Sequence, residues 1–529
     1  MSNILFCFFY FLLFSVFILR SKWFTIEGVN NKSFLFVFYL KLLFGVGLWF
    51  IYTHIYKNRT TSDIFKYFDD AKMIFDTLHT STKDYFAMLT GIGDSDAHYQ
   101  FIYHSMNSWD NAHNNLFYTN SHFIIRLNAF FLLFSHGCYG VHIIFMCFIA
   151  LVGLTYIYKT FVLFIQSRRK ILFAAIFLFP SVILWSSGIL KEGLVWFALG
   201  LSIYHFFQLT NNNTRRWKHI IWILIGFILL FELKAYVLLC LLPGLIAQLL
   251  IKKIYFLGKR PVLSYIVAIT LLLIPAFFPG VFSRSYNPLQ MLSDKQTDFN
   301  RISSGGIYLL NIKDSSDYAV IATKDSSQIV PLNSWADSLL HKKGIQYLAS
   351  NSFCHYECAS QHKAPFMLRK GTPFAHVRSG NIDTLREIAN DSTIYLLYIY
   401  VETAKSRIHI EPIQPNALSL IRNIPQALKV SMLLPYPWQL HSAMTTIYCA
   451  ENIFVLLLLF IALFFIKRPI LHKDLALFCL SYCVMMLILI GLVTPILGGI
   501  ERYKSVVIPF IFILLLLITQ KPLAKADDK

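Results

Sequence analysis

The sequence has few charged residues for its length, and this scarcity limits the class of protein. Asp, Glu, Lys and Arg together make up only 14% of its 529 residues, whereas soluble proteins carry roughly 25%. Hydrophobic residues make up 56%, and many apolar runs approach the ~20 residues that a helix needs to cross a bilayer. The composition excludes an ordinary soluble enzyme and predicts a polytopic α-helical membrane protein.

The sequence also lacks the motifs that bind soluble nucleotides. It contains no Gly-x-x-x-x-Gly-Lys loop and no Gly-x-Gly-x-x-Gly fingerprint, two short patterns whose backbone amides hold nucleotide phosphates. Internal repeats and low-complexity tracts are absent as well. A soluble nucleotide donor is therefore not expected for any transfer reaction of this protein.

Cysteines are few and form no strong metal motif. Most of the nine lie in apolar runs, where they serve as small fillers. Cys354 and Cys358 lie instead in the polar stretch CHYECASQH, together with His355 and His362. This stretch lacks the second Cys-x-x-Cys half of a zinc site. A disulfide or two free thiols is the favoured interpretation, with metal binding as the minor alternative.

About eleven membrane-spanning helices are predicted from the apolar runs. The segment 123–134 is short and contains Arg126 and Asn128, so it is predicted to lie in the outer membrane interface. The predicted spans are 3–20, 33–55, 140–164, 171–188, 190–208, 219–233, 235–251, 262–280, 450–466, 474–494 and 504–520.

The basic residues predict the orientation in the membrane. Most of the net charge of +19 lies in connections on one side of the predicted spans, and basic connections stay in the cytoplasm. This distribution explains the charge without a nucleic-acid partner. It predicts a bacterial inner-membrane protein with its N-terminus outside, its C-terminus inside and two large loops in the periplasm.

The chain divides into five predicted segments. Runs of β-branched and aromatic residues, as in TIYLLYIYVETAKSRIHIEPI (393–413), indicate strands in the second large loop. The segments are 1–55 with the first two transmembrane helices, 56–139 as a periplasmic loop with acidic and interfacial helices, 140–280 with six transmembrane helices, 281–449 as a periplasmic α+β insertion, and 450–529 with three transmembrane helices and a cytoplasmic tail.

The first outer loop begins with an acidic helix, SDIFKYFDDA (62–71). Asp63, Tyr67 and Asp70 are spaced i, i+4 and i+7 and share one face, whereas Asp69 points about 100° away. A solvated helix surface and a functional site explain this spacing equally well. Two carboxylates could hold a divalent ion, but no further ligands accompany them. A divalent metal stays an option, and no cofactor is assigned.

Charged residues recur at the predicted outer ends of the spans. Lys191 and Glu192 lie in SSGILKEGL, and Arg502 and Lys504 lie in GGIERYK. Lys and Arg at span ends commonly snorkel to the interface, but this explains repeated Glu less well. The residues predicted to bind substrate at one site on the outer membrane face are Asp63, Arg126, Lys191, Glu192, His441, Arg502 and Lys504.

Such a site suits the transfer of a group from a lipid phosphate. A carboxylate such as Asp69 or Asp70 can take the proton of an incoming hydroxyl. Arg and Lys can neutralise a departing phosphate or pyrophosphate. The aromatic-rich spans could hold a long isoprenoid tail within the membrane.

An acidic motif directly after a span, followed by interfacial helices, resembles the first outer loop of the GT-C superfamily of integral-membrane glycosyltransferases. YFDDA (67–71) is similar to the catalytic position of that loop. PSVILWSSGILKEGL (180–194) and GGIERYKSVVIPF (498–510) are similar to stretches of bacterial surface-polysaccharide transferases and polymerases.

This resemblance implies a polyprenyl-phosphate or polyprenyl-pyrophosphate sugar as donor, with a glycan, lipid or protein as acceptor. It also implies that Asp69 or Asp70 is the catalytic base, and that Lys191 and Arg502 contact the donor phosphates. Membrane lipids would be the other partners.

Two alternatives stay open. The late outer loop resembles the arrangement in O-antigen polymerases and ligases, which implies a site around Arg422, Lys429, Trp438 and His441 in 422–442. A lipid or polysaccharide transporter, or an envelope scaffold, belongs to another class. Transporters bury ionisable residues near the midplane and break their helices. The sequence shows neither feature here, although Pro180, Pro243 and Pro275 could break spans.

Overall fold

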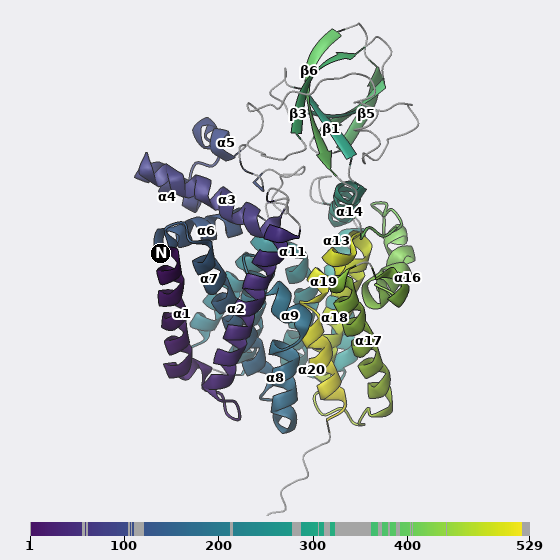
Figure 1. Ribbon diagram of the computed structural model, residues 1–529. Helices are drawn as coiled ribbons and strands as arrows, with labels where there is room; N and C mark the ends of the chain where they lie inside the picture. Colours follow the sequence, from purple (N-terminus) through teal and green to yellow (C-terminus); the bar gives the residue numbers. More distant parts are fainter. Residues whose placement is uncertain are drawn as a thin grey trace, which may run out of the picture. The chain divides into compact units, whose positions relative to one another are not determined.

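The computed structural model describes the chain as two compact units (Figure 1). The membrane unit comprises Met1–Ile51, Cys138–Ser293 and Ile410–Lys529, and the loop unit comprises Tyr52–Gly137 and Asp294–His409. The described residues are 2–55, 59, 62–103, 106, 108–109, 121–211, 215–277, 287–304, 306–311, 318–322, 361–368, 373–378, 381–387, 392–401, 404, 406–440 and 442–520.

Seven helices in these described ranges are long and apolar enough to cross a membrane, which confirms the predicted class of helical membrane protein. A helix of 20 residues rises ~30 Å, the thickness of the hydrocarbon core. The seven are α1 (Ser2–Arg20), α2 (Asn31–His54), α7 (Tyr139–Phe161), α10 (Lys191–Thr210), α11 (Arg216–Lys253), α17 (Ala443–Phe464) and α18 (Lys473–Val493).

Two predicted spans are interrupted in the structure. The predicted span 171–188 consists of α8 (Arg169–Phe177) and α9 (Pro180–Trp185), because proline lacks an N–H and begins a new helix. The predicted span 504–520 begins within α19 (Leu497–Lys504) and continues as α20 (Ile508–Ile518). These segments are helical, as predicted, but apolar composition did not predict their interruptions.

Helix α11 turns back on itself at Lys234, whose φ of −156° and ψ of 80° are not helical. Before this residue, His219 Nδ1 lies 2.8 Å from His205 Nδ1, in the C-terminal part of α10. After it, Lys252 Nζ lies 3.0 Å from Thr210 Oγ1, at the same end of α10. Because both ends of α11 meet one end of α10, the helix is a hairpin. Its arms coincide with the predicted spans 219–233 and 235–251.

Small residues allow the helices of the membrane unit to approach closely. A Cβ added to Gly153 of α7 would meet the backbone of Trp196 and Phe197 in α10, and a Cβ on Gly200 would meet the backbone of Gly153. Three further α-helices described in this unit are α12 (Tyr255–Gly258), α13 (Pro261–Phe277) and α16 (Ala417–Leu433). Helix α14 (Pro288–Ser304) crosses from the membrane unit into the loop unit after Ser293.

The described residues of the loop unit before α7 form four α-helices, and one of them coincides with the predicted interfacial segment 123–134. This helix, α6, has 14 residues and rises only ~21 Å, less than the ~30 Å of a hydrocarbon core. The four helices are α3 (Asp63–Asp76), α4 (Thr82–Thr90), α5 (Ala97–Tyr103) and α6 (His122–Ser135).

The later part of the loop unit contains an antiparallel sheet with the strand order β3-β6-β1-β2-β4-β5. Leu309 lies opposite Tyr398 in the pairing of β1 with β6. Cys354 and Cys358, for which a disulfide or two free thiols was predicted, lie outside the described residues. The strands are β1 (Gly306–Asn311), β2 (Tyr318–Ala322), β3 (Gln361–Leu368), β4 (Pro373–Arg378), β5 (Asn381–Glu387) and β6 (Ser392–Val401).

Candidate functional site

The polar centre of the membrane unit is the carboxylate of Glu192, in the first turn of α10. Its side chain is fully buried. Oε1 accepts a hydrogen bond from Lys234 Nζ at 2.6 Å and another from Arg502 Nε at 2.7 Å. Oε2 is also buried and has no hydrogen-bond partner among the described residues. We call Glu192, Lys234 and Arg502 the ion cluster.

Each member of the ion cluster lies at an interruption of a helix. Helix α10 begins just after Gly188, whose φ of +83° suits a residue without a Cβ. Lys234 is the apex of the α11 hairpin, and Arg502 lies in the short helix α19. Broken helices inside a membrane protein are tolerated where protein or a cavity lines them, and they commonly mark binding sites.

Aromatic rings accompany both cations of the cluster. The ring of Tyr503 lies 4.1 Å from Lys234 Nζ, and the ring of Trp185 lies 5.8 Å from Arg502 Cζ. Rings at this range attract cations. The indole N–H of Trp185 is buried and donates to no described group, so the site holds an unused hydrogen-bond donor beside its cations.

The cations near Glu192 have the chemistry that an anionic ligand requires. Lys191, which precedes Glu192 in the chain, is also buried. Lys and Arg commonly bind phosphate, and a guanidinium such as that of Arg502 can do so in a bidentate manner.

A second set of polar contacts involves Glu501 and Lys504 of α19. Glu501 Oε1 accepts hydrogen bonds from Asn452 Nδ2 at 3.1 Å and from Lys504 Nζ at 3.3 Å. Glu451 of α17 accepts the backbone N–H of Ser181 at 2.7 Å. Lys191, Glu192, Arg502 and Lys504, which the sequence predicted for one site, thus lie at α10 and α19 in the membrane unit.

Lys41 of α2 is a buried cation that the sequence analysis did not predict as a site residue. Its side chain is fully buried, and Nζ donates to the carbonyl oxygen of Ser186 at 3.3 Å and to the Ser186 hydroxyl. No carboxylate in the described ranges pairs with it. Its sequence signal is a single Lys within LFVFYLKLLFG, because an ionisable residue inside a span is commonly functional.

The predicted catalytic carboxylates lie in α3 of the loop unit, in different environments. Asp70 is fully buried, and its Oδ2 accepts the backbone N–H of Ser108 at 2.7 Å. The side chain of Asp69 is 32% exposed and pairs with Arg59 at 2.6 Å. Asp63 is the first residue of the helix. Asp69 and Asp70 therefore point in different directions, as the spacing predicted.

These environments predict different effects on stability. Replacing Asp70 with Ala should lower the free energy of unfolding of the loop unit by about 1–3 kcal/mol, because the half-buried N–H of Ser108 loses a fully buried charged acceptor. Replacing Asp69 with Ala should change it by less than ~1 kcal/mol, because that ion pair is exposed. Limited proteolysis of the full chain at increasing denaturant concentration would compare them, and equal sensitivity would contradict this assignment.

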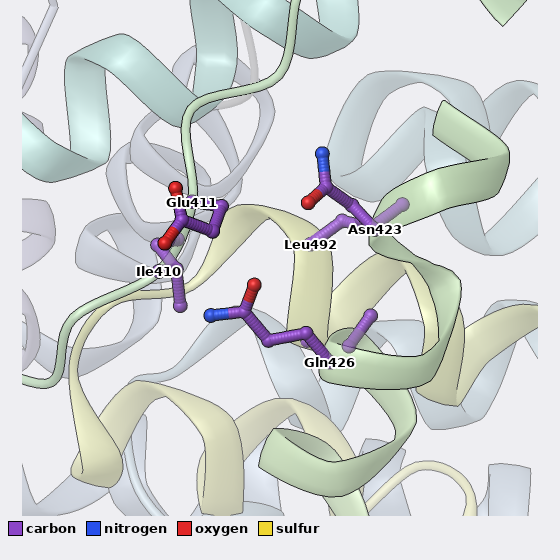
Figure 2. A pocket seen from close by; sticks show the side chains of 7 residues that line it. Ile410, Glu411, Asn423, Gln426 and Leu492 are labelled. Carbon is purple, nitrogen blue, oxygen red and sulfur yellow. The ribbon is translucent and has the colours of Figure 1, made fainter. Parts of the chain in front are cut away.

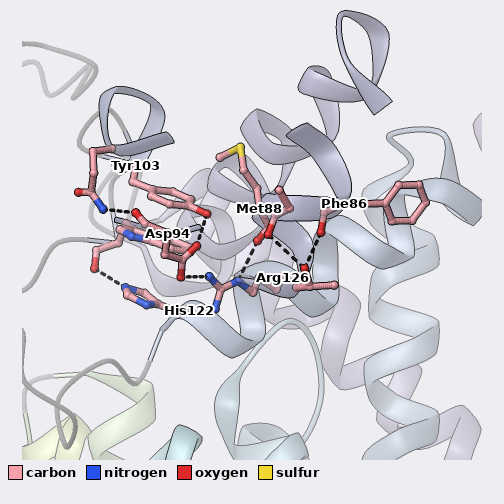
Figure 3. A network of polar contacts seen from close by, with 10 residues as sticks. Phe86, Met88, Asp94, Tyr103, His122 and Arg126 are labelled. Carbon is pink, nitrogen blue, oxygen red and sulfur yellow. Dashed lines mark hydrogen bonds and ion pairs between the residues drawn. The ribbon is translucent and has the colours of Figure 1, made fainter. Parts of the chain in front are cut away.

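Arg126 ties together segments of the loop unit (Figure 3). Its Nε donates to the Met88 carbonyl at 2.9 Å, its guanidinium pairs with Asp94, and Cζ lies 5.0 Å from the Trp109 ring. Tyr103 donates to the same Asp94 at 2.7 Å. Burial and this hydrogen bond raise the pKa of Tyr103 well above its usual value. These contacts give Arg126 a structural role, and its contact with substrate stays a prediction.

The late-loop alternative receives little support from the described residues. Predicted site residue His441 lies outside them. Arg422 is exposed on α16, and a small open pocket nearby is lined by Glu411, Asn423 and Gln426 with apolar neighbours (Figure 2). Because this described lining contains no cationic side chain, it does not suit a phosphate.

Neither metal ligands nor similarity to known proteins indicates a function for this chain. Within the described ranges, no three His, Cys, Asp or Glu side chains come together in a way that could hold a metal ion. Comparisons with protein-family models, with curated proteins and with solved structures give no match. The function is therefore inferred from the residues and their geometry.

Proposed function

We propose that the protein is an integral-membrane glycosyltransferase that moves a sugar or glycan from a polyprenyl-linked phosphate or pyrophosphate donor to an acceptor. The observation that carries this proposal is the buried ion cluster, in which Lys234 and Arg502 share one carboxylate beside Lys191. Cations in such low-dielectric surroundings interact strongly with phosphate. The long apolar helices suit the isoprenoid tail of the donor.

In the proposed reaction, a hydroxyl oxygen of the acceptor forms a bond to the anomeric carbon of the donor sugar. The bond from that carbon to the phosphate oxygen breaks, and the polyprenyl phosphate or pyrophosphate leaves with the electron pair, stabilised by Arg502 and Lys191. The proton of the acceptor passes to a carboxylate that acts as general base, a role for which Asp69 and Asp70 of the loop unit are the candidates predicted from the sequence. Asp69 is the more accessible of these two carboxylates.

The distribution of basic residues supports a periplasmic site. Glu192 lies at the N-terminal end of α10, whereas Lys252 bonds to Thr210 at the other end. Arg168 donates to Thr519, just after the end of α20. Because basic connections stay in the cytoplasm, the ion cluster would face the periplasm of a bacterial inner membrane. That location suits the assembly of cell-surface glycans.

Replacing Arg502 with Ala should weaken binding of a polyprenyl diphosphate by about 10- to 100-fold, because a charge-assisted hydrogen bond to phosphate is lost. Binding would be measured with the purified full chain in lipid nanodiscs. Arg502→Lys keeps the positive charge and should bind the ligand more tightly than Arg502→Ala. Partial binding by this variant would show that a change at position 502 does not unfold the protein. Arg216→Ala, an exposed change at the start of α11, is the matched control. Unchanged affinity in Arg502→Ala would overturn the phosphate assignment.

A transporter of lipid-linked glycans is the second candidate, and one observation favours it. The prediction of unbroken spans is wrong for 171–188, which is divided into α8 and α9, and the ionisable side chains of Lys41 and Glu192 are fully buried. Transporters share these features. Proteoliposomes separate the two candidates: sugar transfer from a labelled polyprenyl-phosphate sugar supports the enzyme, whereas translocation of a fluorescent polyprenyl diphosphate without transfer supports the transporter.

A further inference from the structure

A pair of cysteines in the membrane unit has no part in the proposed transfer reaction. Cys7 lies in the second turn of α1, and Cys138 directly precedes α7. Their Sγ atoms are 3.4 Å apart, although the two residues are 131 positions apart in the chain. We call Cys7 and Cys138 the thiol pair. The contact joins two helices, which the interpretation of cysteines in apolar runs as small fillers did not predict.

The surroundings of the thiol pair hold the two sulfur atoms in contact. A Cβ added to Gly140 would lie 2.6 Å from Cys7 Sγ, so the missing side chain of this glycine leaves room for the Cys7 thiol. Cys138 Sγ also donates to the carbonyl oxygen of Asn3 at 3.4 Å, in the first turn of α1. Two thiols in direct contact can form a disulfide with small movements of their side chains.

Helices α1 and α7 run parallel to each other, with the thiol pair at the N-terminal end of both. Beyond the pair, the ring centroids of Tyr10 and Phe145 lie 4.9 Å apart. Further along both helices, the rings of Phe17 and Phe148 lie 5.7 Å apart. Because these contacts advance along both helices together, the packing of α1 against α7 fixes the position of the thiol pair.

Helix α10 runs parallel to α7 as well. A Cβ added to Gly193 would lie 3.4 Å from the Cβ of Ala150, and one added to Gly200, further along α10, would meet the backbone of Gly153, further along α7. The start of α7 therefore lies on the same side of the membrane unit as the start of α10, which carries Glu192. If the ion cluster faces the periplasm, the thiol pair lies at the periplasmic side too.

We propose that Cys7 and Cys138 form a disulfide that anchors α1 to α7 in the native protein. This proposal rests on the periplasmic orientation proposed above, because disulfides persist in the periplasm and are rare in the cytosol. The oxidant is the disulfide of a periplasmic thiol oxidoreductase. One cysteine thiolate attacks that disulfide, and the other then displaces the oxidoreductase from the mixed disulfide. The new S–S bond forms, the disulfide of the oxidoreductase becomes two thiols, and these take the two protons that the cysteines lose.

The bond would fasten a helix that has little packing of its own. Most described side chains of α1 face outward, and Ser15 and Ile18 are those that are buried. A disulfide between distant positions also restricts the unfolded chain. A reductant such as tris(2-carboxyethyl)phosphine should therefore lower the melting temperature of the wild-type protein by several degrees. It should leave the melting temperature of Cys7→Ser unchanged.

Mass spectrometry of the full chain, expressed in bacteria, tests the bond directly. The cells are quenched with acid, free thiols are blocked with N-ethylmaleimide in denaturant, and the protein is digested. The peptide that contains Cys7 should be joined to the peptide that contains Cys138, and reduction should separate them. Cys7→Ser should leave Cys138 open to the maleimide, and Cys138→Ser should do the same for Cys7. Cys449→Ser, which removes a free buried thiol of α17, is the matched control and should leave the bond intact.

Three outcomes would overturn the proposal. These are maleimide on both members of the thiol pair in the wild-type protein, a cross-link of either one to a third cysteine, and a wild-type melting temperature that reduction does not change. The wild-type measurement needs no variant to fold. Binding of a polyprenyl diphosphate is measured separately, so a chain with the disulfide but without affinity for that ligand would remove the phosphate assignment and keep the bond.

Discussion

Replacing Glu192 with Gln should destabilise the membrane unit by about 3–5 kcal/mol. The carboxylate accepts hydrogen bonds from both Lys234 and Arg502, and Gln preserves its size while removing its charge. Lys234, whose side chain is 6% exposed, and Arg502, whose side chain is 15% exposed, then contact a neutral amide in place of a carboxylate. The free energy of unfolding in mixed micelles measures this effect directly.

Glu27→Gln is the matched control for this loss of charge. The same chemical change is made on a carboxylate that is 89% exposed and lies 3.5 Å from Arg169, so the expected effect is below ~1 kcal/mol. A double variant, Glu192→Gln with Lys234→Met, removes one cation together with the carboxylate and should recover part of the stability. If Glu192→Gln and Glu27→Gln had the same free energy of unfolding, the ion cluster would make no special contribution to the stability of the membrane unit.

The Glu192→Gln variant also tests the ligand of the ion cluster. A polyprenyl diphosphate would replace the lost negative charge, and a ligand that binds only the native state raises its stability. Saturating ligand should therefore raise the melting temperature of the variant more than that of the wild-type protein. If the ligand stabilised neither protein, the ion cluster would have a purely structural role.

The sequence was most informative where one physical property determined the structure. Apolar length predicted the presence of long apolar helices, and the division between 219–233 and 235–251 coincides with the apex of the α11 hairpin. Apolar length did not predict that α8 and α9 are separate helices or that α19 precedes α20. Hydropathy measures how apolar the side chains of a segment are. It does not show whether the backbone hydrogen bonds of a helix continue through the segment.

The site was predictable in part for a related reason. Glu192 and Arg502 stood out as charges in apolar surroundings, and the structure pairs them directly. Their contact joins residues 310 positions apart in the chain, so no local pattern could reveal it. Lys41 carried the same signal and could have been predicted. The burial of Asp70 could not, because it depends on the amide of Ser108.

The ion cluster also depends on how closely α10 approaches α7, because α10 carries Glu192. Replacing Gly153 with Leu should destabilise the membrane unit by about 4 kcal/mol or more, a magnitude reserved for severe core disruption. A side chain there meets the backbone of Trp196 and Phe197, and a backbone cannot turn aside as a flexible side chain can. Unfolding in mixed micelles and binding of a polyprenyl diphosphate would both be measured.

Gly47→Leu provides the matched comparison, because nothing lies within 4 Å of a Cβ added at that position in α2. Both changes add the same side chain to a glycine in a membrane-spanning helix, so they share effects on helix propensity and on insertion. Only Gly153→Leu should separate α10 from α7, and only that variant should lose affinity for the phosphate ligand. Equal stability of the two variants would show that α7 and α10 do not depend on this close contact.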